Sequence, residues 1–233
     1  MIYVVSDIHG NYEKYIKIYD RINLTDTDTL YVLGDVVDRG TNSMKILLDM
    51  MCRSNVIPIL GNHEFMAETI LSKLIKEITE ENLSIFSDDF LTGMLSWIND
   101  NGGENTLADF KNLPLEDRLA VLEYLEEFRL YEKVIVNNQD YILVHSGLSN
   151  FKENKPLDSY TIDEMIWTRA DYNKIYYKDK ILITGHTPVS FILNDISADK
   201  ILKQNNHIAI DCGCGYGKNL GILCLDTMEE FYI

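Results

Sequence analysis

The sequence predicts an α/β fold in which central mixed β-sheets are flanked by helices and carry a helical insert. Three observations predict it: the first sixty residues alternate short apolar runs with amphipathic stretches, the middle of the chain has mostly helical periodicity, and short apolar runs at hairpin-like spacing return after it. Alternating strands and helices are typical of a parallel sheet covered by helices. We expect a single domain, residues 1–233, with the insert at about 65–130.

The first part of the chain predicts the order βαβαβ. Strands are expected at Ile2–Val5, Thr29–Leu33 and Val56–Leu60, because these short runs are apolar. Helices are expected at Tyr12–Ile22 and Ser43–Cys52, which are amphipathic. In a parallel sheet of this kind, ligands bind beyond the carboxyl ends of the strands. A site is therefore expected after these strands.

The rest of the chain predicts a helical segment followed by further strands. Helical periodicity predicts helices at 66–78, 90–98 and 115–128, with a polar break at 99–106. The strands after them are expected to be antiparallel or mixed, at 133–136, 141–144, 181–184, 207–211, 220–225 and 229–233.

Composition argues against several classes of protein. The net charge of −16 argues against a nucleic-acid surface, because such a surface needs clustered Lys and Arg. No stretch approaches the roughly 18 to 20 apolar residues of a membrane span, and the N-terminus lacks a signal-peptide pattern. Four cysteines in a chain of this length do not make a disulfide framework, which points to a reducing compartment. We expect a cytoplasmic protein that binds neither nucleic acid nor membrane.

Polar residues recur directly after five of the apolar runs. The segments are S-D-I-H-G-N at 6–11, G-D-V-V-D-R-G at 34–40, G-N-H-E at 61–64, H-S-G-L at 145–148 and G-H-T-P at 185–188. A capped turn explains any one of them, since Asp and Asn cap helices and glycine permits unusual backbone angles. Capping does not explain five of them at the ends of predicted strands.

The histidines follow the same pattern. The chain has five, and all except His207 lie in these segments, namely His9, His63, His145 and His186. A lone histidine is usually a core or surface residue, but four of them near carboxylates at strand ends indicate metal ligation. Imidazole, carboxylate and amide ligands suit Mn, Fe or Zn rather than a soft thiolate site.

These segments, in this order, resemble the phosphoprotein phosphatase branch of the calcineurin-like metallophosphoesterases. The resemblance runs from Asp7 to Thr187, and the size of the chain is similar to that of the small bacterial and phage serine/threonine protein phosphatases. The segments Trp97–Thr106 and W-T-R at 167–169 also resemble parts of those enzymes. The resemblance implies the sandwich fold of the family and a metal-dependent phosphatase activity.

The resemblance also implies two bound divalent or transition metal ions, and we expect both to be Mn, with Fe or Zn as the alternatives. Asp7 and His9 would bind the first, Asn62, His145 and His186 the second, and Asp35 would bridge both. A hydroxide that bridges the two metals would attack the phosphorus in line, without a phosphoenzyme intermediate.

Four further residues receive catalytic roles from the resemblance. His63 would protonate the leaving group as general acid, and Asp38 would orient its imidazole. Arg39 and Arg169 would bind the phosphate of the substrate, because a guanidinium matches two phosphate oxygens. For Arg169 a plain surface arginine stays open as an alternative.

The substrate has two interpretations. The first is a phosphorylated protein or peptide, cleaved by a serine/threonine protein phosphatase. The alternative is a dinucleoside polyphosphate of the diadenosine tetraphosphate type, or another small phosphate compound, because close relatives with such motifs act on these. A non-catalytic binding module is disfavoured. Such a protein would be expected to lose at least one metal ligand, and in this chain the expected ligands are all present. The sequence leaves open the physiological substrate, the two metals and the oligomeric state.

Overall fold

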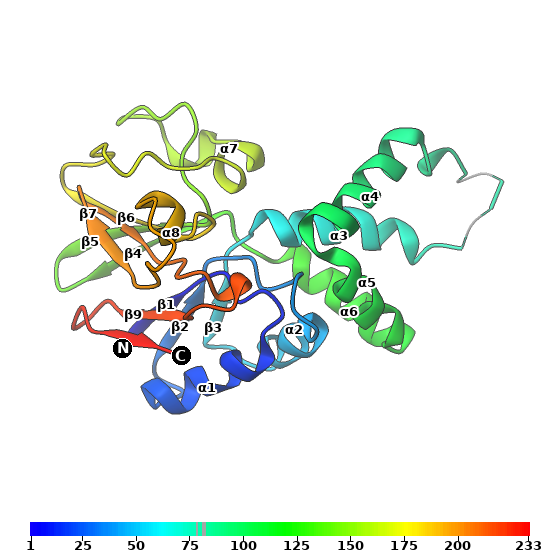
Figure 1. The fold of residues 1–233 in the computed structure, drawn as a ribbon, viewed down its shortest axis with the longest axis horizontal. Helices are drawn as coiled ribbons and strands as arrows, with labels where there is room; N and C mark the ends of the chain where they lie inside the picture. Colours follow the sequence, from blue (N-terminus) through cyan, green and yellow to red (C-terminus); the bar gives the residue numbers. More distant parts are fainter. Residues whose placement is uncertain (78, 81–82) are drawn as a thin grey trace.

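The strands of the computed structural model, which describes residues 1–77, 79–80 and 83–233, form two five-stranded mixed sheets (Figure 1). The first sheet has the order β10-β9-β1-β2-β3 and the second β4-β5-β6-β8-β7. Side chains of both sheets, among them Val4, Leu33, Leu143 and Ile183, form one buried apolar cluster, so the sheets pack face to face. The predicted sandwich of mixed sheets with flanking helices is confirmed.

The first sheet combines the two ends of the chain. β1, β2 and β3 run parallel, whereas β9 is antiparallel to β1 and β10 is antiparallel to β9. Its strands and connecting helices are β1 (Ile2–Val5), α1 (Tyr12–Ile22), β2 (Thr29–Val32), α2 (Ser43–Met51), β3 (Val56–Pro58), β9 (Gly221–Cys224) and β10 (Glu230–Tyr232). The βαβαβ order predicted from the sequence is present.

The second sheet has a parallel centre and antiparallel edges. β6 pairs parallel with both β5 and β8, while β4 and β7 are antiparallel to their neighbours. The strand β7 was not predicted, since three residues give almost no alternation. The elements of this half are β4 (Tyr131–Val136), β5 (Gln139–Val144), α7 (Ile162–Ile166), β6 (Lys180–Thr184), α8 (Val189–Ile192), β7 (Leu202–Gln204) and β8 (His207–Ala209), with 3-10 helices η2 (Leu157–Ser159) and η3 (Cys214–Tyr216).

Four α-helices follow β3 and gather on one side of the sheets (Figure 1). The polar break predicted at 99–106 is wrong, because α4 continues to Asn101 and α5 begins at Gly103. Gly102 joins them with a left-handed φ of 80°, which glycine adopts without strain. The predicted end of the first insert helix, Ile78, lies outside the described residues. The elements are α3 (Asn62–Leu74), η1 (Leu83–Ile85), α4 (Asp88–Asn101), α5 (Gly103–Asn112) and α6 (Leu115–Glu126).

These helices share a core with the first sheet. Leu30 and Val32 of β2, Leu47 of α2, Leu71 of α3 and Trp97 of α4 belong to one cluster of buried apolar side chains. The cluster fixes α3 to α6 against the loops that leave the first sheet. Within the described ranges, no helix combines the length and apolar character needed to cross a bilayer.

His207 is buried in the second sheet rather than in the candidate site. Its Nε2 lies 2.9 Å from Thr184 Oγ1, and its ring stacks on Tyr172 with centroids 4.3 Å apart. Burial lowers the pKa of His207 from 6.5 to about 3, so the folded protein holds a neutral imidazole.

Acidification is expected to destabilise the fold through His207. The unfolded chain takes up this proton near pH 6.5 and the folded chain only near pH 3, so the stabilisation is complete above pH 6.5 and is lost below it. Between pH 7 and pH 5 the loss amounts to about 2 kcal/mol. Urea unfolding at both pH values should show this loss in the wild type in excess of that in His207→Gln. Equal losses in the two proteins would contradict the prediction.

Candidate functional site

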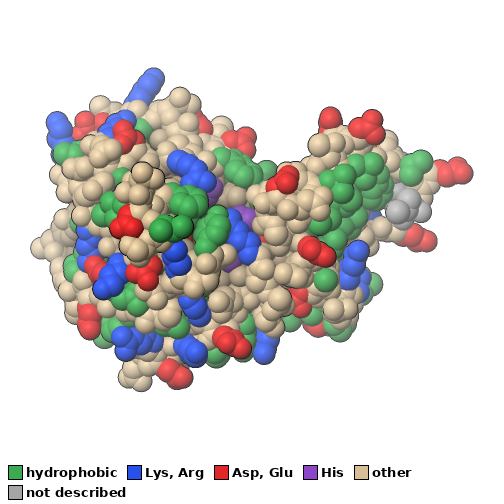
Figure 2. Space-filling model, viewed as in Figure 1, with side chains coloured by type: hydrophobic (Ala, Val, Ile, Leu, Met, Phe, Trp, Pro, Cys, Tyr) green, Lys and Arg blue, Asp and Glu red, His purple; other side chains and the backbone are tan. Residues whose placement is uncertain are grey.

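The loops that follow β1, β2, β5 and β6, together with the first turn of α3 after β3, carry nine of the ten predicted site residues. Figure 2 shows His side chains beside Lys and Arg side chains at a hollow between the α3–α6 side and the sheets. The contacts given below join all five segments, so the structure brings these residues together. They are Asp7 and His9 after β1, Asp35, Asp38 and Arg39 after β2, Asn62 and His63 after β3, His145 after β5, and His186 after β6.

Most of these residues have a strained backbone. Six of the nine have a positive φ, which is the left-handed region. In the rest of the described chain, the non-glycine residues with a positive φ are asparagines and Met228. A left-handed conformation costs a residue with a Cβ on the order of 1 kcal/mol or more, so it persists only where the surroundings hold it. Such strain is typical of functional sites, and here it shapes the loops that carry the polar side chains. Six site residues have φ between 49° and 71°: Asp7, His9, Asp35, Asp38, Arg39 and His186.

Asp35 lies at the centre of the cluster. Its Oδ1 is 3.3 Å from His145 Nε2, and its Oδ2 is 3.7 Å from His9 Nε2 and 3.8 Å from His63 Nε2. Two groups with potential metal-binding atoms therefore share this carboxylate, one with His9 and His63 and the other with His145 and His186. A carboxylate with its two oxygens directed at different groups can bind two cations at once.

Backbone carbonyls orient two of the imidazoles. His9 Nδ1 lies 3.0 Å from the Val37 carbonyl oxygen, and His145 Nδ1 lies 2.7 Å from that of Leu33. In each ring Nδ1–H donates to the carbonyl, which leaves the Nε2 lone pair directed at Asp35. Hydrogen bonds of this kind fix the tautomer of metal-binding histidines.

The amide oxygen of Asn62 completes the second group. Asn62 Oδ1 lies 3.0 Å from His145 Nε2 and 2.9 Å from His186 Nδ1. The backbone N–H of His186 donates to the carboxylate of Asp7, with distances of 3.1 and 3.0 Å to its two oxygens. The loops after β1, β5 and β6 and the first residue of α3 therefore meet around one small volume.

Buried charge makes this volume suitable for cations. Burial raises the pKa of Asp7 well above its ordinary value, and the negative charges of Asp211 and Asp35 raise it further. Burial also lowers the pKa values of His9 and His145, so these imidazoles are neutral and have free lone pairs. Divalent cations would relieve the repulsion between the carboxylates and bind the imidazoles. The residues present therefore fit a pair of divalent metal ions.

His63 differs from the other histidines. Its Nδ1 lies 2.7 Å from Asp38 Oδ2. Burial lowers the pKa of His63, but the carboxylates of Asp35 and Asp38 outweigh this effect and hold the pKa above its ordinary value. A protonated imidazole with an acidic partner can donate a proton from Nε2 to a leaving group. The structure therefore places His63 in contact with Asp38, the carboxylate predicted to orient it, and also puts its Nε2 in the group of potential metal-binding atoms around Asp35.

The helices α4 and α5 hold the loop that contains Asp38 and Arg39. Trp97 Nε1–H donates to Asp38 Oδ2 at 2.8 Å, so this oxygen has both the indole and the His63 imidazole as partners. Thr106 Oγ1 accepts from the backbone N–H of Asp38 at 2.9 Å, and Asn105 Nδ2 donates to the Arg39 carbonyl at 3.0 Å. The insert therefore sets the position of both side chains.

The two arginines differ in their surroundings. Arg39 Nη2 lies 3.3 Å from His63 Nε2, and its guanidinium carbon lies 4.7 Å from the centre of the Tyr216 ring. Arg169 is exposed, and its Nη1 is 3.4 Å from Thr187 Oγ1, beside His186. Arg39 therefore lies among the histidines around Asp35, whereas Arg169 lies at the exposed edge of this group.

Glu64 supports the loop that carries Asp35. Its carboxylate accepts four backbone N–H groups, from Asp35 and Gly61 at Oε2 and from Val36 and Val37 at Oε1, at 2.7 to 3.1 Å. The buried carboxylate thus shapes the loop that positions Asp35.

Replacement of Glu64 by glutamine is expected to destabilise the fold. The glutamine NH₂ group would face N–H donors, leaving at least one buried donor without an acceptor at a cost of about 2 kcal/mol. Urea unfolding of Glu64→Gln should report this loss, and the control Glu68→Gln, on the next turn of α3, should lose less than about 0.5 kcal/mol. Equal stability of the two variants would show that the loop does not depend on this carboxylate.

Two important residues escaped the sequence analysis as site residues. Asp211 is a buried carboxylate after β8, and burial raises its pKa to about 7. Its sequence, I-D-C-G at 210–213, repeats the pattern of an acidic residue and glycine after an apolar run, which could have identified it. Trp97 begins the segment 97–106 that resembles parts of the family's small enzymes, but its place in a helical period predicts only a core position and no contact with Asp38.

A family model confirms the relationship that these residues suggested. Residues 1–213 match the family described as calcineurin-like phosphoesterases. The chain belongs to this family. Calcineurin-like phosphoesterases are metal-dependent hydrolases with two divalent metal ions, and the clusters around Asp35 are the candidate ligands of those ions in this member.

Individual relatives of this calcineurin-like phosphoesterase differ in how much they share with it. The asymmetrical bis(5′-nucleosyl)-tetraphosphatase PrpE of Anoxybacillus flavithermus is 21% identical over 258 aligned positions, which cover 98% of this chain and 92% of the relative. The symmetrical bis(5′-nucleosyl)-tetraphosphatase of Wigglesworthia glossinidia brevipalpis is 34% identical over 100 residues, but the match spans only 36% of its length. A solved structure described as a candidate diadenosine tetraphosphatase has a TM-score of 0.68 at 18% identity, covering 100% of this chain and 92% of that one, which shows a shared fold.

Proposed function

We propose that this protein hydrolyses dinucleoside polyphosphates such as diadenosine tetraphosphate. The observation that carries the proposal is the match to the asymmetrical bis(5′-nucleosyl)-tetraphosphatase PrpE, because it extends over nearly the whole length of both chains. The cluster around Asp35 and Arg39 has the groups that phosphoester or phosphoanhydride hydrolysis requires.

The metal ions belong to this proposal: imidazole, carboxylate and amide ligands suit Mn, Fe or Zn, and of these we propose Mn. The ions supply Lewis-acid charge and an activated water. Their ligands in the proposal are Asp7 and His9 for the first, Asn62, His145 and His186 for the second, and Asp35 for both.

The remaining site residues act on the substrate. Arg39 binds non-bridging phosphate oxygens and is kept in place by the Tyr216 ring on which it lies. Arg169 binds the phosphate chain from the edge of the site, next to His186. His63 donates a proton from Nε2 to the leaving oxygen, while Asp38 and Trp97 keep the imidazole in place.

One observation favours serine/threonine protein phosphatase activity as a second candidate. The leaving group of a phosphoserine is an alkoxide, which is poor and needs a proton, and the contact between His63 and Asp38 at 2.7 Å provides an oriented acid for it. The polyphosphate leaving group of an anhydride needs this proton far less.

A parallel turnover assay tests the two candidates. The enzyme is reconstituted with Mn²⁺ and given diadenosine tetraphosphate, a phosphoserine peptide and p-nitrophenyl phosphate at equal concentrations. We expect kcat/KM for diadenosine tetraphosphate to exceed that for the peptide by at least about a hundredfold, roughly 2.7 kcal/mol of transition-state binding. A preference of similar size for the peptide would refute the proposed function and support the second candidate.

A further inference from the structure

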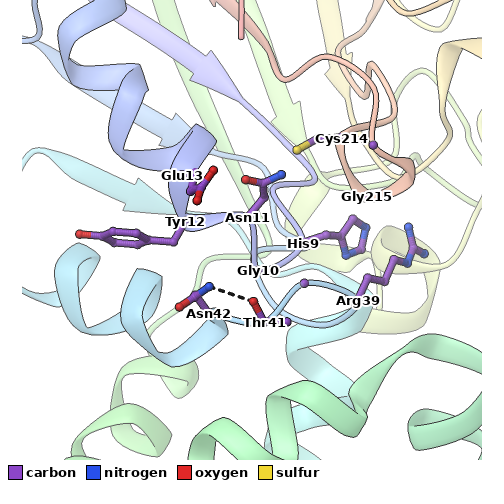
Figure 3. A pocket seen from close by; sticks show the side chains of 12 residues that line it. His9, Gly10, Asn11, Tyr12, Glu13, Arg39, Thr41, Asn42, Cys214 and Gly215 are labelled. Carbon is purple, nitrogen blue, oxygen red and sulfur yellow. Dashed lines mark hydrogen bonds between the residues drawn. The ribbon is translucent and has the colours of Figure 1, made fainter.

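Ser6 begins the S-D-I-H-G-N segment, in which only Asp7 and His9 have a role in the proposed function. The later part of this segment and the start of α1, residues 9–13, line an open cavity beside Arg39 (Figure 3). Ser6 itself is buried, with 2% of its surface exposed. It can therefore affect the reaction only through its neighbours in the protein.

The hydroxyl of Ser6 is within reach of two acceptors. Its Oγ contacts Asp7 Oδ2 and lies 3.4 Å from the Leu33 carbonyl oxygen. That carbonyl already accepts the Nδ1–H of His145 at 2.7 Å. A hydroxyl has one proton to donate, and a carboxylate is a stronger acceptor than a carbonyl. The proton of Ser6 is therefore donated to Asp7.

The two oxygens of the Asp7 carboxylate have different partners. The backbone N–H of His186 donates to both of them, at 3.1 Å to Oδ1 and 3.0 Å to Oδ2, and Ser6 is a second donor to Oδ2. Each carboxylate oxygen has two lone pairs. Ser6 thus occupies the remaining lone pair of Oδ2, and Oδ1 keeps one lone pair for a cation.

The loop after β6 packs tightly on this pair of side chains. Gly185 lies so close that a Cβ there would overlap both Ser6 Oγ and Asp7 Oδ2. The backbone N–H of Gly185 donates to the His145 carbonyl at 2.8 Å, which ties this glycine to the loop after β5. Close packing on this side of Ser6 keeps its hydroxyl next to Asp7.

We infer that Ser6 is a positioning residue for the first metal ion and acts through Asp7. The inference rests on the metal ligands of the proposed function and deepens it. Two further buried carboxylates, Asp35 and Asp211, repel the charge of Asp7, so its side chain needs donors that hold it in place. Hydrogen-bond partners of metal ligands typically contribute about 10- to 100-fold to metal affinity. Because Ser6 donates to Asp7 and not to a ligand of the second ion, its loss weakens the first ion alone.

Titration with Mn²⁺ tests this role without a measurement of turnover. Free Mn²⁺ is followed by its electron paramagnetic resonance signal in the metal-free wild type and in Ser6→Ala. In the variant, the dissociation constant of one ion should rise by at least about tenfold, while that of the other changes by less than about threefold. Melting in the presence of EDTA checks that the variant is folded. Unchanged affinity for both ions, or equal weakening of both, would overturn the inference.

Ser146→Ala is the matched control. Ser146 is also a buried serine next to a proposed ligand, His145, but its hydroxyl donates to the Met165 carbonyl at 2.7 Å. This variant should bind both ions as the wild type does.

Asp7→Asn separates a failure of the inference from a failure of the ligand assignment. It should weaken one ion at least as much as Ser6→Ala does, because Asp7 is the group through which Ser6 acts. Normal binding of both ions by Asp7→Asn would overturn the ligand assignment of the proposed function and the inference with it. Loss of one ion in Asp7→Asn with normal binding in Ser6→Ala would overturn only the role of Ser6.

Discussion

Asp35→Asn is expected to remove bound metal and to lower turnover by about a thousandfold or more. The carboxylate of Asp35 is common to both candidate groups, with one oxygen near His145 and the other near His9. An amide has one neutral oxygen and cannot share a negative charge between two cations. The loss corresponds to the several kcal/mol that metal ions contribute to a transition state of this kind.

Metal content and thermal stability test this prediction without relying on activity. After reconstitution with Mn²⁺ and desalting, the wild type should retain two ions per chain and Asp35→Asn fewer than two. Metal binding to the folded state alone raises the melting temperature, so a chelator should lower it in the wild type and have little effect in the variant. Asp26→Asn, an exposed aspartate in the loop before β2, is the control. Two retained ions in Asp35→Asn would show that this carboxylate does not bridge them.

Much of the site could be predicted because its determinants are local. Asp7, His9 and Asp35 each lie within four residues of the end of an apolar run, and the carboxyl ends of parallel strands meet at one edge of a sheet. The order βαβαβ could likewise be predicted from periodicity, because the apolar pattern of a strand or helix is contained in a short stretch of sequence. His145 and His186 follow β5 and β6, which also pair in parallel, so a single rule places both.

The missed features depend on contacts between distant parts of the chain. Trp97 and Asp38 are 59 positions apart, and no local pattern shows that a buried indole donates to that carboxylate. The Asn-Gly-Gly sequence before Glu104 looked like a break, yet Gly102 ends one helix and Gly103 begins the next. At Gly103 a Cβ would lie 2.3 Å from Trp97 Cε2, so this glycine is needed for the two helices to pack. Such requirements are visible only once the tertiary structure is known.

His63→Asn is expected to separate the two kinds of substrate. For a phosphoserine peptide, loss of the general acid should lower kcat by about 10² to 10⁴, because the alkoxide must then leave without a proton. For diadenosine tetraphosphate the loss should be less than about tenfold, since a polyphosphate leaves readily as an anion. Single-turnover measurements on both substrates, with the same metal loading, give the comparison.

A graded series distinguishes proton donation from metal binding at His63. Trp97→Phe removes one N–H donor from Asp38 and keeps an apolar ring, so it should lower peptide turnover by about tenfold with a smaller effect on the anhydride. Trp167→Phe, at the exposed tryptophan, is the matched control. If His63→Asn instead lowers turnover of both substrates equally and loses a metal ion, then His63 is a ligand through the group it forms with His9 and Asp35. If His63→Asn keeps its full metal content and loses turnover only on the phosphoserine peptide, then His63 is the proton donor. In that case the loss of turnover depends on how poor the leaving group is, which is the property that proton donation compensates.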